Sequence, residues 1–169
     1  GASAAAALLV PTAVPAQPPA FDPLPALPVT PTPGQPGDFD FLTGEWRIQN
    51  WSLVNGEWLA YEGQATVTGL LAGVGSVEEL RIPARQFSGM GLRLLDVERK
   101  LWADHWVNAK SGVLAPSPSW GSFEGGVGTW DSDDTEDGKP VIWRGVWDQI
   151  TPTSCRWYQA VSRDSGASW

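Results

Sequence analysis

From Phe41 onward the chain consists of short segments rich in aromatic and β-branched residues, and Gly, Pro, Asn or Asp separates most of them. No window keeps the 3.6-residue apolar period of an amphipathic helix for three turns. Runs of this kind at regular spacing are typical of antiparallel strands. We therefore predict strands over residues 41–53, 58–71, 76–82, 87–95, 101–108, 121–130, 141–149 and 155–162.

The residues between these segments indicate tight hairpins. Asn55-Gly56 separates the first two segments, and this dipeptide suits a two-residue turn because both positions tolerate a positive φ. Residues 96–100 form a charged turn, and Asp137-Gly138 lies in an acidic tip. Every connection suits neighbouring antiparallel strands, so we predict an all-β, antiparallel up-and-down β-barrel of about eight to ten strands.

The first 37 residues differ sharply from the rest of the chain. They hold most of the 15 prolines, whereas all 11 tryptophans come later. Residues 1–16 are small and apolar, like the hydrophobic region and cleavage site of a bacterial signal peptide. An alanine-rich leader without a targeting role is the alternative. We expect a signal-peptide remnant over 1–16, a Pro-rich linker over 17–37 and one domain over 38–169.

These boundaries predict a periplasmic or extracellular protein that is cleaved after Ala16 or Ala20, by either the Sec or the Tat route. The net charge of −8 and the absence of a basic stripe argue against a nucleic-acid partner. Cys155 is the only cysteine, which excludes an internal disulfide and a CxxC zinc site. No apolar run approaches the ~20 residues of a membrane-spanning helix.

Residues 38–46, DFDFLTGEW, contain Gly44 and Trp46 in the GxW pattern that opens the first strand of lipocalins. With residues 92–96, 102–106, 150–154, 156–160 and 162–166, this segment resembles a bacterial family of unknown function with a lipocalin-like, calycin-type β-barrel. The resemblance implies that fold over 38–169, with Trp46 closing the barrel floor. It also implies one more strand after Trp169, so that the last strand here is truncated.

The chain departs from the family pattern at three positions on strands. Asp104 stands where the family has an apolar residue, His105 where it has an aromatic residue, and Tyr158 where it often has a carboxylate. These differences put a ligand shared with the family in doubt.

Residues 162–169, SRDSGASW, match the Asp-box pattern of sialidase propellers, but the box occurs once and in a short chain. We therefore expect a structural turn in which the Asp164 side chain accepts backbone hydrogen bonds. Gly166 supplies a positive φ in this turn, and Trp169 packs beneath it.

His105 is the only histidine, so a two-histidine metal site is excluded and haem held through His105 is a minor alternative. An EF-type calcium loop starting at Asp133 would need a glutamate at position 144, where Arg144 stands. We therefore interpret the acidic residues 131–137 as a solvated hairpin tip and predict no metal.

The 11 tryptophans are too many to lie on the surface without large exposed patches, so we expect indole rings to line the barrel. The candidate ligand-binding residues are Trp106, Asn108, Trp147 and Gln159. Arg93 lies between Leu92 and Leu94, which suggests that its side chain points away from the apolar core.

Three functions stay open. The first is binding of a small apolar or amphipathic molecule in a Trp-lined barrel. The second is a small enzyme, an isomerase, cyclase or hydrolase, that uses a carboxylate–Arg pair in the cavity. The third is a non-catalytic interaction domain with a filled barrel. A void of several hundred Å³ favours the first two, whereas a filled interior favours the third. If the last strand is truncated, residues 155–162 form an open edge that favours association of two copies.

Overall fold

The computed structural model describes residue 18 and residues 32–169. The predicted signal-peptide remnant and most of the predicted linker lie outside these residues. The strands, in chain order, are β1 (Gly44–Val54), β2 (Glu57–Leu70), β3 (Gly75–Ile82), β4 (Phe87–Asp96), β5 (Leu101–Asn108), β6 (Ser119–Glu124), β7 (Val127–Glu136), β8 (Lys139–Asp148) and β9 (Arg156–Ser162). Three single-turn 3-10 helices, η1 (Asp40–Leu42), η2 (Leu71–Gly73) and η3 (Pro83–Arg85), lie before β1, β3 and β4.

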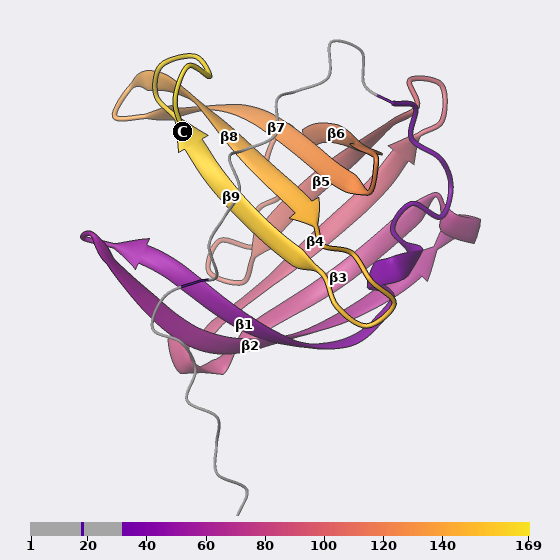
Figure 1. Cartoon of the computed structure of the whole chain (residues 1–169), viewed down its shortest axis with the longest axis horizontal. Helices are drawn as coiled ribbons and strands as arrows, with labels where there is room; N and C mark the ends of the chain where they lie inside the picture. The colour runs from indigo at the N-terminus through magenta and orange to yellow at the C-terminus, as the bar shows by residue number, and fades with distance from the viewer. Residues whose placement is uncertain (1–17, 19–31) are drawn as a thin grey trace, which may run out of the picture.

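The nine strands form one antiparallel sheet, and their order in the sheet is their order in the chain. The sheet curls from β1 and β2 round to β8 and β9 as a half-barrel (Figure 1). The predicted all-β, up-and-down fold is therefore confirmed. In the sheet formed by residues 44–162, β1 and β9 are the two edge strands and do not pair with each other.

Glycine-containing turns set the hairpins. Asn55 and Gly56 have φ of 51° and 81°, as expected for the predicted Asn-Gly turn between β1 and β2. The predicted single strand over 121–130 is wrong, because Gly125 and Gly126 turn the chain there with φ of 58° and 82°. Two adjacent glycines adopt this conformation without steric cost, so the segment forms a β6–β7 hairpin.

The acidic segment is also more regular than predicted. Strand β7 continues to Glu136, and the turn itself is Asp137-Gly138, with φ of 52° and 75°. Asp131 lies opposite Arg144 on β8, and its carboxylate accepts two hydrogen bonds from that guanidinium, at 2.8 and 2.9 Å. The acidic residues up to position 136 therefore belong to a paired strand.

An aromatic core fills one end of the concave side. Phe39, from the turn before β1, lies 4.9 Å from Trp102 and 5.4 Å from Trp130, measured between ring centroids. The Nε1–H of Trp102 donates to the Asp38 carboxylate at 3.0 Å. The Gly34 amide donates to the Lys100 carbonyl at 2.7 Å, so a residue before the predicted boundary at position 38 also contacts the sheet.

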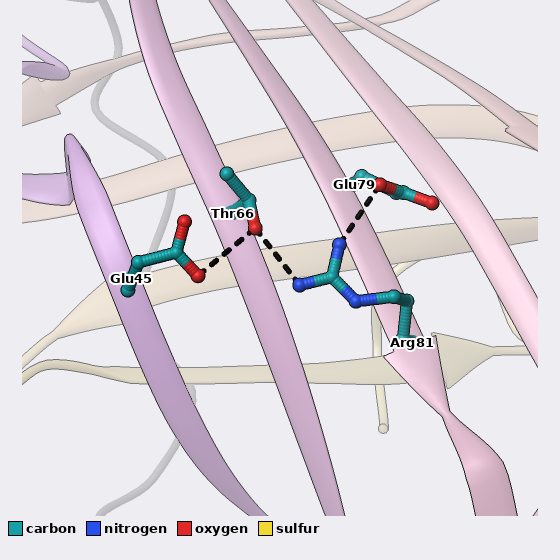
Figure 2. Close-up of polar contacts among 4 residues, drawn as sticks. All are labelled: Glu45, Thr66, Glu79 and Arg81. Atoms are coloured by element: carbon teal, nitrogen blue, oxygen red, sulfur yellow. Dashed lines mark hydrogen bonds and ion pairs between the residues drawn. The ribbon is translucent and has the colours of Figure 1, made fainter.

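The opposite face of the first three strands carries polar side chains (Figure 2). Thr66 donates to Glu45 at 3.0 Å and accepts from Arg81 at 2.8 Å, and Arg81 also pairs with Glu79 at 2.8 Å. These contacts link β1, β2 and β3 across the surface. Exposed pairs of this kind add little stability. We interpret them as ordinary cross-strand contacts on the outer surface of the sheet.

Candidate functional site

Gly145, in the middle of β8, lies at the centre of a ring of indole side chains. Across the sheet it faces Trp130 on β7 and Gln159 on β9. Along β8 its neighbours two residues away are Trp143 and Trp147. Side chains alternate along a strand, so all of these point to the same, concave face. The missing side chain of glycine leaves a gap between them.

This gap is a cleft of about 90 Å³, which we call the indole cleft. Trp157 on β9 covers part of it: its ring centroid lies 6.4 Å from that of Trp147, and 49% of the residue is exposed. The cleft is lined by Asp104, Ser119, Trp130, Ser132, Trp143, Gly145, Trp147, Trp157 and Gln159. Apolar walls with a few polar groups are typical of small-molecule sites.

A row of charged side chains leads across the concave face to the cleft. Arg93 on β4 pairs with the carboxylate of Glu78 on β3, and its Nε lies 3.8 Å from Asp104 Oδ2 on β5. The Arg93 guanidinium also lies 5.4 Å from the ring centroid of Trp147. Its Nε and Nη1 atoms are buried without a hydrogen-bond partner among the described residues.

The prediction that Arg93 points away from the core is wrong. Arg93 is only 3% exposed and points to the concave side, whereas Leu92 and Leu94 lie on the other face and are half-buried. These two leucines lie on the outer face of β4 and are only half-buried, so they do not identify the core face. The Glu78 carboxylate compensates the buried guanidinium.

Asp104 is the charged residue that lines the cleft. Burial raises the pKa of its carboxyl, and Glu78 raises this pKa further, while Arg93 and His105 act in the opposite direction. Asp104 therefore holds a proton more readily than a surface aspartate. A carboxyl of this kind beside an arginine is able to bind a cation or to exchange a proton with a ligand.

The structure separates the four predicted ligand-binding residues. Trp147 and Gln159 line the indole cleft. Trp106 and Asn108 lie further along β5, outside the cleft lining. Trp106 stacks on Phe87 with 6.4 Å between ring centroids, and Asn108 Oδ1 accepts from two backbone amides of the following turn at 3.0 and 3.1 Å.

The residues predicted to have structural roles lie outside the cleft. Gly44 opens β1 with φ of 134°, and Trp46 packs against the core and donates to the Leu42 carbonyl at 2.6 Å. In the last turn, Asp164 accepts from the Ser168 amide at 2.8 Å, and Gly166 has φ of 89°.

The hydroxyl and the backbone amide of Ser168 both donate to the Asp164 carboxylate, and these hydrogen bonds lower the pKa of Asp164 to about 2. The Arg144 guanidinium lies 4.3 Å from the ring centroid of Trp169.

His105 lies beside Asp104 on β5 and therefore points to the opposite face from the cleft. Its buried Nδ1 has no hydrogen-bond partner among the described residues. Within residues 32–169, no group of three or more His, Cys, Asp or Glu side chains is arranged to hold a metal ion. No helix in the same part of the chain is long and apolar enough to cross a membrane.

A wider hollow of about 520 Å³ lies along the β7–β8 hairpin. It is lined by Asp133, Asp134, Thr135, Pro140, Val141, Ile142 and Ser165. This lining contains no aromatic ring, so the hollow lacks the flat apolar walls that the indole cleft has.

Sequence reasoning missed most of the cleft. Counting back by two along β8 from Trp147 reaches Gly145 and Trp143, and the same step on β9 leads from Gln159 to Trp157. The alternation of side chains was therefore a usable signal. Predicting Trp130 as a lining residue requires locating the Gly125-Gly126 turn, because that hairpin sets the register of β7.

A scan against models of protein families finds no match to this chain, and a search of curated proteins likewise finds no similar protein.

Proposed function

We propose that this protein binds a small apolar or amphipathic molecule, part of which enters the indole cleft. The observation that carries the proposal is the gap at Gly145, which four indole rings surround and which Asp104 borders. Flat apolar walls with few polar atoms favour a ring or a compact alkyl group.

The size of the cleft limits how much of a ligand it encloses. About 90 Å³ is well below the ~300–1,000 Å³ of pockets that hold whole drug-sized molecules. Only a ring or head group would be buried, and the rest of the ligand would lie along the open concave side. The aromatic core around Phe39 and Trp102 fills only one end of that side.

The family relation and the location belong to the same proposal. Consecutive antiparallel strands and Trp46 near the start of β1 support a relation to the lipocalin-like family. The apolar residues 1–16 support export to the periplasm or the cell exterior.

A second candidate function is acid–base catalysis, because the concave face holds a carboxylate–Arg pair. Asp104 borders the cleft, its pKa is raised by burial, and Arg93 lies beside it. Such a carboxyl would act as a general acid or base on a ligand in the cleft. Turnover of a bound molecule that Asp104→Asn abolishes would favour catalysis over binding alone.

Two half-exposed tryptophans allow a matched test of binding. Trp157→Ala removes a wall of the cleft, whereas Trp106→Ala removes a ring that is 39% exposed and lies outside it. We expect a panel of aromatic and fatty ligands to quench tryptophan fluorescence saturably, and Trp157→Ala to weaken that binding at least tenfold. Trp106→Ala should leave the affinity within about twofold.

Native mass spectrometry of protein purified from its own source supplies an independent measurement. If no ligand co-purifies and no member of the panel gives saturable quenching, the binding proposal fails. The interaction domain with a filled interior is then the better account.

A further inference from the structure

The indole cleft combines aromatic walls with one negative side chain. The indoles of Trp130, Trp143, Trp147 and Trp157 line it, and Asp104 is its only charged lining residue. The face of an aromatic ring carries negative charge, and tryptophan attracts cations more strongly than the other aromatic side chains. Both the walls and the carboxylate therefore favour a positive group.

The charged side chains behind the cleft also favour a positively charged ligand. Glu78 and Asp104 oppose the single guanidinium of Arg93, so the row carries a net negative charge when both carboxylates are ionised. Arg93 is 3% exposed and does not line the cleft, so its free N–H groups do not face an incoming ligand. An anion would meet Asp104 instead.

We propose that the indole cleft binds an organic ammonium group, such as a trimethylammonium head, between its indole rings and Asp104; this rests on the proposed binding function. A quaternary ammonium group has no N–H donors to satisfy, so apolar walls with few acceptors suit it. Its compact shape also fits a cleft that is too small for a whole ligand.

Choline and its carbon isostere, in which a tert-butyl group replaces the trimethylammonium group, test the charge alone. The two molecules have nearly the same shape, so an apolar cleft would bind them equally. We expect titration calorimetry on the full chain to show choline binding at least tenfold more tightly than the isostere. Equal affinities would overturn the ammonium inference and leave the proposed binding function standing.

Two aspartate variants separate the cleft from the overall charge of the protein. Asp104→Asn removes the carboxylate at the cleft, and Asp137→Asn makes the same change in net charge at an exposed hairpin tip. We expect the first to weaken choline binding about tenfold and the second to change it less than twofold. Equal effects would assign the attraction to the acidic surface and overturn the proposal.

Gly145→Ala tests the position of the site without a clash. A Cβ atom built there lies 3.4 Å from Trp157 Nε1, which is ordinary van der Waals contact, so the variant should fold. It fills part of the gap and should weaken choline binding at least tenfold. Unchanged binding in Gly145→Ala, with an unchanged circular dichroism spectrum, would place the ammonium elsewhere and overturn the proposal.

The ammonium group has two sources, a soluble molecule or a lipid head group. Sedimentation with phosphatidylcholine vesicles, compared with phosphatidylglycerol vesicles, distinguishes them once choline binds. Retention by the first alone assigns the group to a lipid, and no retention assigns it to a soluble ligand. If choline does not bind while the ligand panel quenches fluorescence saturably, only the ammonium inference is overturned. If neither choline nor any member of the panel binds, the proposed binding function is overturned as well.

Discussion

At the scale of single residues, the concave face determines the chemistry of Cys155. The thiol is half-buried before β9, and burial followed by the nearby Glu78 raises its pKa to about 11, although Arg93 acts in the opposite direction. The thiolate is the nucleophile in cysteine chemistry. The fold therefore makes this lone cysteine an unreactive group at neutral pH.

We expect Cys155 to react slowly with an aromatic disulfide reagent at pH 8. A rise in its pKa from 9.0 to about 11 lowers the thiolate fraction roughly 100-fold, and burial slows access further. The measurement compares the rate in folded protein with the rate in denaturant at the same pH. Similar rates in the two states would show that the thiol is neither buried nor shifted in pKa.

Alternation along the strands is the signal that the sequence offers for single residues. Trp147 and Gln159 were selected as lining residues and lie together in the cleft, because both follow the parity of their strands. Arg93 was assigned to the wrong face because its leucine neighbours suggested a core on their side. Alternation separates the two faces of a strand, but only packing decides which face is buried, and on β4 the charged Arg93 lies on the buried face.

At the scale of the strands, glycines allow aromatic rings and neighbouring backbone to approach closely. A Cβ atom at Gly121 on β6 would lie 2.0 Å from the Thr129 carbonyl oxygen and 2.8 Å from the Trp130 ring. At Gly89 on β4 the nearest atoms, at 2.3 and 2.7 Å, belong to the far edge of the half-exposed Trp106 ring. A methyl group at Gly121 would therefore clash with backbone, whereas one at Gly89 would clash with a side chain that has room to move.

Gly121→Ala should destabilise the fold by about 1–3 kcal/mol, because the β6–β7 hairpin must shift to admit the methyl group. Gly89→Ala should cost clearly less, since rotation of Trp106 relieves its clash. Urea denaturation of both variants and the parent protein measures the free energies of unfolding. Equal losses in the two variants would contradict this account of the β6–β7 contact.

Strands were the level at which the sequence was most informative. The Asn55-Gly56 turn and the alternating segments gave most of the elements, because hairpin turns have specific residue requirements. The Gly125-Gly126 turn was missed inside an otherwise continuous aromatic segment, and the register of β7 was lost with it. The sequence predicts a solvated hairpin tip for the acidic residues of β7, because their charge hides the pairing with β8.

At the scale of the whole molecule, the half-barrel has two unpaired edges, β1 and β9, among the strands of residues 44–162. Residues 48–54 of the β1 edge, IQNWSLV, contain no charge and no proline. Short uncharged segments of high β-propensity at an exposed edge favour pairing with another chain. Whether the first and last strands pair to close the barrel could not be predicted from the sequence alone, because that contact depends on how strongly the sheet curls.

We therefore expect concentration-dependent self-association through the β1 edge, which a lysine in that edge should suppress. Leu53 on β1 is 58% exposed, and Leu59 on the adjoining strand β2 is 44% exposed, so Leu53→Lys and Leu59→Lys add the same charge to one hairpin, on opposite faces of the sheet. Only the first places charge in the edge strand, so only Leu53→Lys should shift the distribution towards monomer. Sedimentation velocity over a wide concentration range measures this shift. A monomer at every concentration, or equal effects of the two lysines, would show that the β1 edge does not pair with a second copy.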